Sequence, residues 1–200
     1  MGQIANEMAL KLAFEIKDKI KEKSEQKKAE KKEYAPRYEK ITHEKDLELL
    51  RRAIEVSKEA RASGNHPFGA LLADEEGNIL MEQGNCQVET GDCTGHAETT
   101  LMRRASMKYD KEFLWNCSLY TSCEPCVMCT GAIYWGNVGR IVYAMDEKSL
   151  LAMTGSNEEN PTFNHPCRGI LEGGQKDIVV NGPFPELFEE AYEAHKGFWD

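Results

Sequence analysis

The stretch TSCEPCVMCTGAIYW, residues 121–135, runs from the end of an expected strand into an expected helix. Cys126 and Cys129 stand three positions apart in it, so both side chains lie on one face of the helix. Pro125 suits the first helical position, where its missing N–H costs nothing. Unpaired N–H groups at a helix start favour thiolates over thiols. The stretch therefore predicts two thiolates at the start of a helix.

A second motif, His96-Ala97-Glu98, stands about 30 residues upstream, at the expected start of another helix. One imidazole and two thiolates can hold Zn²⁺ and leave its fourth coordination position open. A glutamate two residues beyond the histidine can move protons beside that position. We therefore predict a zinc site made by His96, Cys126 and Cys129, with Glu98 as the catalytic proton carrier. Taken alone, Glu98 is also typical of an ordinary first-turn glutamate favoured by the helix dipole.

Cys123 complicates the metal assignment, because it forms a second, overlapping C-x-x-C pair with Cys126. A structural zinc site or a redox dithiol could use it. A redox pair leaves the histidine and glutamate motif unexplained, and Cys123 precedes the helix, so we expect no ligand there. The other cysteines lack ligand-like spacing and are expected to be small, buried or partly buried residues. They are Cys86, Cys93, Cys117 and Cys167.

Composition narrows the class of protein. The 200 residues most often make one domain, and 40% are hydrophobic, enough for a core. No apolar run approaches the roughly 20 residues that span a bilayer, and the start of the chain lacks a secretory pattern, so we predict a cytoplasmic protein. The net charge of −9 disfavours a long nucleic-acid track, since Lys and Arg supply most affinity for phosphate. A neutral base or nucleoside remains compatible with this charge.

The first 40 residues differ from the rest. They carry eleven Lys and Arg against eight Asp and Glu, a net charge of +3 that leaves −12 for residues 41–200. Apolar residues at helical spacing predict an amphipathic helix over residues 3–23, followed by a polar stretch over residues 24–32. This extension could dock on a partner, a membrane surface or its own subunit. The simpler alternative is an added helix that packs on the domain formed by residues 41–200 or moves freely.

The body alternates helices and strands, which favours a layered α/β domain. Helices are expected over residues 42–62, 96–107 (with Thr94 as a cap), 125–135 and 185–195, and strands over 68–73, 79–81, 118–122, 140–144 and 177–180. The long connection over residues 146–176 includes a helix-like stretch, and such crossovers suit parallel pairing. We predict a five-stranded mixed sheet with strands 4 and 5 parallel.

The run over residues 121–135 resembles the cytidine-deaminase superfamily, whose base deaminases carry H-x-E followed by P-C-x-x-C. Pro67-Phe68-Gly69-Ala70 and Gly84-Asn85 are similar to the branch that contains guanine deaminase, with tRNA adenosine deaminase more distant. The resemblance covers residues 45–150 well and omits the first 40. It implies a three-layer α/β/α fold, zinc, and a homodimer with active sites near the interface.

By position, the resemblance implies that His96, Cys126 and Cys129 are the zinc ligands. It implies that Glu98 is the proton shuttle. It implies that Asn85 offers its amide to the base or sugar, although a turn asparagine that ends a strand would look the same. Phe68 would form an apolar wall against the ring, or else be a core phenylalanine. Gly95 stands where the family often has alanine, and we expect it to loosen the helix start.

An acidic residue after the fourth strand would suit recognition of the edge of a guanine base. Glu158 and Glu159 are the candidates, with exposed loop charges as the alternative. The C-terminal His195, Phe198 and Trp199 could close over a pocket, even that of a neighbouring subunit, or pack on the sheet.

Three functions follow from these observations. The first is hydrolytic deamination of a free nucleobase or nucleoside, with a guanine-type aminopurine favoured and a cytosine or cytidine type as alternative. The second is tRNA adenosine deamination, which the acidic body disfavours, as do the last sixteen residues, whose single Lys or Arg is Lys196. The third is a zinc-stabilised interaction module that works through residues 1–40. Glu98 speaks against it, because a structural site has no use for an unliganded carboxylate.

Overall fold

The computed structural model describes residues 38–155, 157–158 and 160–199. Tyr38–Asp200 form one compact unit. The helix expected over residues 3–23 and the polar stretch after it lie outside the described residues, so the division of the chain at residue 40 stays a prediction. Within the described ranges, no helix is long and apolar enough to cross a membrane.

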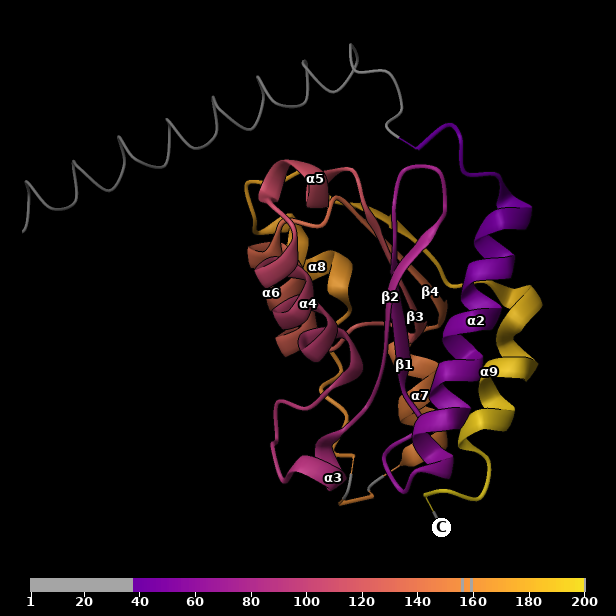
Figure 1. Cartoon of the computed structure of the whole chain (residues 1–200). Coiled ribbons are helices and arrows are strands. Elements are labelled where there is room, and N and C mark those ends of the chain that lie inside the picture. The colour runs from indigo at the N-terminus through magenta and orange to yellow at the C-terminus, as the bar shows by residue number, and fades with distance from the viewer. Residues whose placement is uncertain (1–37, 156, 159, 200) are drawn as a thin grey trace, which may run out of the picture. The chain divides into compact units, whose positions relative to one another are not determined.

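A five-stranded sheet forms the centre of this unit, with the strand order β2-β1-β3-β4-β5 (Figure 1). The strands are β1 (Gly69–Ala73), β2 (Ile79–Gly84), β3 (Ser118–Cys123), β4 (Arg140–Met145) and β5 (Val179–Asn181). β1 is antiparallel to β2 and β3, whereas β3, β4 and β5 run parallel. The predicted mixed sheet with strands 4 and 5 parallel is confirmed. The three central strands are buried along their whole length, as strands covered on both faces should be.

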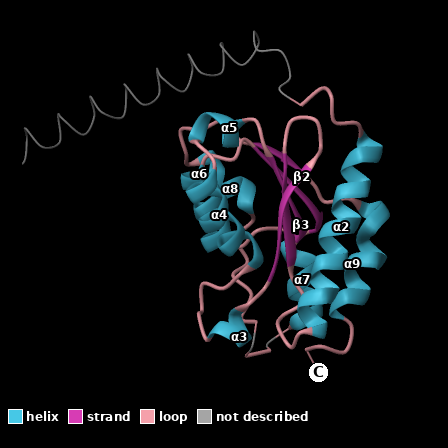
Figure 2. Ribbon diagram, in the orientation of Figure 1, coloured by secondary structure: helices cyan, strands magenta, loops and turns pink. Residues whose placement is uncertain are grey.

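Helices cover both faces of the sheet, which gives three layers (Figure 2). One face carries α4 (Ala97–Lys108), α6 (Val127–Gly136) and α8 (Cys167–Glu172); the other carries α2 (His43–Ala62), α7 (Glu147–Thr154) and α9 (Phe188–His195). Alternation along the strands builds the two cores. In β1, Leu72 packs into the core beneath α4 and α6, while Leu71 packs into the core beneath α2 and α9.

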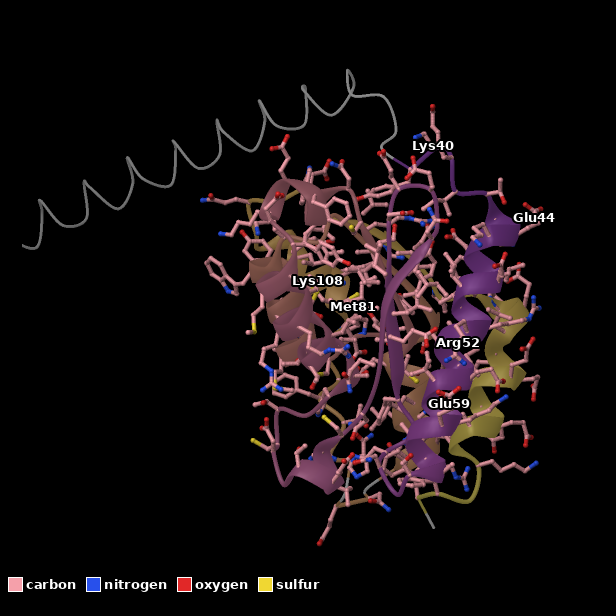
Figure 3. The ribbon with its side chains drawn as sticks, in the orientation of Figure 1. Lys40, Glu44, Arg52, Glu59, Met81 and Lys108 are labelled. Atoms are coloured by element: carbon pink, nitrogen blue, oxygen red, sulfur yellow. The ribbon has the colours of Figure 1, made fainter. Side chains whose placement is uncertain are left out.

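An ion pair joins α2 to the edge of the sheet. Arg52 donates from Nε and Nη2 to the two carboxylate oxygens of Glu82 on β2, at 2.6 and 2.7 Å. It also donates from Nη1 to Glu59, two turns further along α2, at 2.7 Å (Figure 3). The edge strand β2 is therefore tied to α2 through a side chain and to β1 through its backbone.

Several boundaries differ from the sequence-based expectations. β2 extends to Gly84 and so ends directly before Asn85. The closing helix starts with a 3₁₀ turn at Pro185–Leu187. Three short helices were not expected: α3 (Gln87–Thr90), α5 (Lys111–Trp115) and α8. Each has six residues or fewer, too few for a periodic pattern to reveal.

Both predicted helix starts near the site are shifted. Thr94 is not the cap of α4: its hydroxyl donates to Asp92 at 2.7 Å, and His96 takes the cap position. Pro125 is not the first residue of α6, because Cys126 is the cap and has an extended backbone. Each helix therefore begins one or two residues later than expected, which leaves His96 and Cys126 at the junction of loop and helix.

Candidate metal centre and substrate cavity

Two helix starts on the same face of the sheet bring the predicted metal ligands together. His96 caps α4, Cys126 caps α6, and Cys129 lies in the first turn of α6. The ligand atoms of these three residues all lie within 4.8 Å of one another. Cys126 Sγ and His96 Nδ1 are 3.7 Å apart, close to the roughly 3.5 Å between a sulfur and a nitrogen ligand on tetrahedral zinc. The donor set and its spacing fit Zn²⁺.

The two thiols have opposite protonation tendencies. Hydrogen bonds from Cys129 and His96 lower the pKa of the Cys126 thiol. The same bond to Cys126, together with burial, raises the pKa of Cys129. A bond to Cys126 also raises the pKa of His96. Metal ligands must be deprotonated, so metal binding here would release protons.

Glu98 is held in place from two sides. Thr121 on β3 donates its hydroxyl to Oε1 at 2.7 Å, and the Cys129 thiol lies 3.3 Å from Oε2. Burial, followed by the charge of Cys126, raises the pKa of this carboxyl group. A carboxyl group whose pKa moves towards neutrality is suited to general acid–base work. The sequence did not reveal Thr121 as the residue that orients Glu98.

Thr99, one residue after Glu98, reaches the same cluster. Its hydroxyl donates to Cys129 Sγ at 3.2 Å. Hydrogen bonds from neighbouring groups orient metal ligands and adjust their basicity. Thr99 thus supports one of the three predicted ligands without being a ligand itself.

A cavity opens beside this cluster and encloses about 340 Å³ of space, part of it open to solvent. It is lined by Phe68, His96, Glu98, Glu124, Cys126, Glu147, Leu150 and Asn160. Four residues that the sequence singled out are among them. Neither Cys129 nor Asn85 is among the residues that line the cavity, and Cys129 is almost fully buried.

The side-chain oxygen of Asn85 accepts a hydrogen bond, whereas its side-chain nitrogen makes none. Its Oδ1 accepts from the backbone N–H of Gln87 at 3.0 Å, which is the role of a turn asparagine. Its backbone N–H donates to the carbonyl of Phe68 at 2.9 Å, so the two residues are adjacent. Its buried Nδ2 has no hydrogen-bond partner among the described residues. A buried donor without a partner is uncommon and calls for an explanation.

The C-terminal aromatic residues pack behind Phe68 and are not among the residues that line the cavity. The Phe68 ring lies 5.1 Å from that of His195 and 6.1 Å from that of Trp199. Trp199 Nε1 donates to His195 Nδ1, so the Nε2 of His195 carries the hydrogen and faces Cys123 Sγ at 3.4 Å. Phe198 packs on His66. Of the two alternatives, these contacts favour packing.

Cys123 is buried against His195 and lies outside the group of possible metal ligands. Burial raises the pKa of its thiol far above the usual range, so it stays neutral. Among the other cysteines, the expectation of burial is wrong for Cys93, which is exposed.

Gly95 does not loosen the start of α4, because it lies outside the helix, before the His96 cap. A Cβ there would come within 2.9 Å of the Asp92 carbonyl and of Gln87 Cα. Glycine therefore allows a close approach of two loop segments, and the expected loosening is not what the structure shows.

Two acidic residues of the cavity were missed by sequence reasoning. Glu147 is the first residue of α7, two positions after the end of β4, and burial raises the pKa of its carboxyl group to about 8. Glu124 follows β3 and accepts from the backbone N–H groups of Glu147 and Cys167. The expectation of an acidic residue after the fourth strand was directed at Glu158, which is exposed and is not among the lining residues, and at Glu159, which lies outside the described residues.

The fold and the histidine–cysteine cluster define the class of the zinc-binding deaminases. Residues 43–145 match the family described as the cytidine and deoxycytidylate deaminase zinc-binding region, and the chain belongs to this family.

Three relatives show the range of the family around this chain. A probable cytosine deaminase of Schizosaccharomyces pombe is 43% identical over 157 residues, 78% of this chain and 94% of that protein. A tRNA-specific adenosine deaminase of Haemophilus influenzae is 35% identical over 54% of this chain and 62% of that protein. The structure of a guanine deaminase from Nitrosomonas europaea superimposes with a TM-score of 0.58 at 25% identity, over 73% of this chain and 80% of that one.

Proposed function

We propose that this chain is a zinc-dependent hydrolytic deaminase of a free nucleobase or nucleoside, with a guanine-type aminopurine as the favoured substrate. The observation that carries the proposal is the convergence of three ligand atoms within 4.8 Å of one another, beside a buried glutamate and a cavity. A structural zinc site needs neither the glutamate nor the cavity.

In this proposal His96, Cys126 and Cys129 hold the zinc ion, which when bound would supply an activated water molecule. Glu98, oriented by the Thr121 hydroxyl, takes a proton from the water and delivers it to a ring nitrogen of the base. The water oxygen ends on the carbon that carried the amine, the second water proton passes through Glu98 to the amine, and ammonia leaves. Phe68 forms the apolar wall against the ring.

Asn85 would contribute to binding through its unpaired Nδ2. An amide nitrogen donates hydrogen bonds, so it suits a carbonyl oxygen of the base or a hydroxyl of a sugar. The adjacent backbone of Phe68 keeps the amide near the wall of the cavity.

The choice of base rests on the relatives and on one sequence pattern. The guanine deaminase neighbour and the Pro67–Ala70 pattern support an aminopurine, whereas the relative from Schizosaccharomyces pombe makes cytosine the second candidate. A tRNA substrate ranks third, because residues 41–200 carry a net charge of −12. A cytoplasmic homodimer is part of the proposal, and sedimentation of the purified protein tests its oligomeric state.

An ammonia-release screen tests the proposal. Zinc-loaded protein is incubated with guanine, guanosine, adenine, cytosine, cytidine and aminotriazines, and in parallel with a tRNA stem-loop. Release from at least one free base or nucleoside supports the proposal. Editing of the stem-loop, with no release from any small molecule, would reverse the order of the candidates.

A further inference from the structure

We propose that Glu147 distinguishes the amine of the substrate from the oxygen that replaces it in the product. This inference rests on the proposed deaminase function. It makes Glu147 a specificity-determining residue, separate from the metal ligands and from the proton carrier.

The backbone of Glu147 is fixed at the carboxyl end of β4. Its N–H donates to Glu124 Oε2 at 3.1 Å, and the preceding Asp146 caps α7 by accepting from the Ser149 N–H at 2.7 Å. The Glu124 carboxylate also accepts from the N–H of Cys167, at the start of α8. These contacts hold the backbone in place and leave the Glu147 side chain free to serve another purpose.

Three carboxyl groups line the cavity, and they differ in how their oxygens are used. Both oxygens of Glu98 have partners, Thr121 and Cys129. Both oxygens of Glu124 accept from backbone N–H groups. In the part of the chain that the structure describes, nothing hydrogen-bonds or pairs with the carboxyl oxygens of Glu147, although the residue is only 4% exposed.

The carboxyl oxygens of Glu147 are not among the fully enclosed polar atoms without a partner, so they are open to the space of the cavity. Glu147 lines the same cavity as Cys126, Glu98 and Phe68, so a molecule that fills the cavity meets it. The cavity therefore offers its occupant one carboxyl group with both oxygens available.

Glu147 shares this cavity with two of the proposed zinc ligands. His96 and Cys126 line it together with Glu147, so a molecule in the cavity meets all three residues. Cys126 is a proposed zinc ligand, and the carbon that reacts must come close to the metal. A bound divalent cation would favour the ionised form of a carboxyl group beside it.

An ionised carboxylate accepts hydrogen bonds and donates none. Hydrolytic deamination converts a base bearing –NH₂, with water, into a base bearing =O and ammonia. The amino group of the substrate and the ammonia released both donate N–H to a carboxylate, whereas the oxygen of the product cannot. Glu147 is therefore placed to bind the substrate more tightly than the deaminated product.

Equilibrium dialysis tests this inference without turnover. Zinc-loaded Glu98→Gln protein is measured with two pairs, cytosine with uracil and guanine with xanthine. For each pair, the dissociation constant of the oxo compound is divided by that of the amine. The same ratio is then measured in the double variant that carries Glu147→Gln as well as Glu98→Gln. We expect the ratio to fall about tenfold or more, because an amide can donate to the oxygen and binds the amine more weakly.

Control variants separate this role from a structural one. Zinc content is expected to be unchanged in the Glu147 variants, and Glu172→Gln, which alters an exposed carboxylate on α8, should leave the ratio as it was. If Glu147→Gln fails to fold, Glu147→Ala replaces it and should lower the ratio by weakening the amine alone.

The two proposals fail in different ways. An unchanged ratio in folded, zinc-loaded Glu147 variants, with ammonia release by the wild type, overturns the role of Glu147 only. If no base of either pair binds and the wild type releases no ammonia, the proposed deaminase function and this inference are both refuted.

Discussion

Replacing Thr99 by valine is expected to weaken zinc binding. The substitution keeps the size of the side chain and removes one hydrogen bond, from the Thr99 hydroxyl to Cys129 Sγ at 3.2 Å. Loss of such a contact to a metal ligand typically costs about 10–100-fold in metal affinity, or about 1.4–2.7 kcal/mol. Because Thr99 is half-buried and contributes a single bond, the lower end of this range is expected.

Competition with a chromogenic chelator measures the zinc dissociation constant. Substitution of cobalt for zinc provides a second readout, since the energy of the thiolate-to-cobalt absorption band should shift when the sulfur loses a donor. Thr99→Ser keeps the hydroxyl and should bind zinc nearly as the wild type does. Thr100→Val is the matched control, because that hydroxyl lies 3.7 Å from Cys86, away from the proposed ligands. Equal zinc affinity and an unshifted cobalt band in folded Thr99→Val would refute the reasoning.

Three further predictions concern the ligands, the core and the cavity. Cys126→Ala should lower zinc content and the melting temperature of the zinc-loaded protein together, as measured by metal analysis and calorimetry; full zinc occupancy would rule out Cys126 as a ligand. Asp46→Asn breaks the buried ion pair with Arg140, whose Nη atoms lie 2.9 and 2.6 Å from the carboxylate. The free energy of unfolding, measured by urea titration, should fall by about 3–5 kcal/mol. An unchanged free energy of unfolding would show that the pair is dispensable. In metal-free protein, the pKa of Glu147 is raised from 4.5 to about 8, so the folded state holds the proton longer than the unfolded state and stability falls as pH rises between these values. Glu147→Gln should remove that part of the fall, seen as a smaller loss of melting temperature between pH 5 and pH 8; an identical pH profile would contradict the placement of Glu147.

The sequence predicted those parts of the site that depend on spacing along one helix. Cys126 and Cys129 share a face because they are three residues apart, and Glu98 follows His96 closely enough to reach the same place. The parallel pairing of β4 and β5 was predictable for a similar reason, because a connection as long as residues 146–176 excludes a tight turn.

The residues that sequence reasoning missed depend on contacts between distant segments. Thr121 comes to Glu98 only because β3 runs beside the start of α4. Glu147 and Glu158 are both acidic residues after the fourth strand, and nothing local separates the buried one from the exposed one. The difference comes from the Glu124 carboxylate, which draws the start of α7 toward the end of β3. A helix start shifted by two residues, as at α6, is likewise set by packing more than by the preference of Pro125 for a first turn.

The most direct test of the central claim compares zinc content and ammonia release in the wild type and in Glu98→Gln. The wild type, loaded with one zinc ion per chain, is predicted to release ammonia from at least one free base or nucleoside. Glu98→Gln should bind the same amount of zinc and release ammonia about 10²–10⁴-fold more slowly. Equal rates in the two proteins, or zinc-loaded wild type that releases no ammonia from any base or nucleoside, would contradict the account.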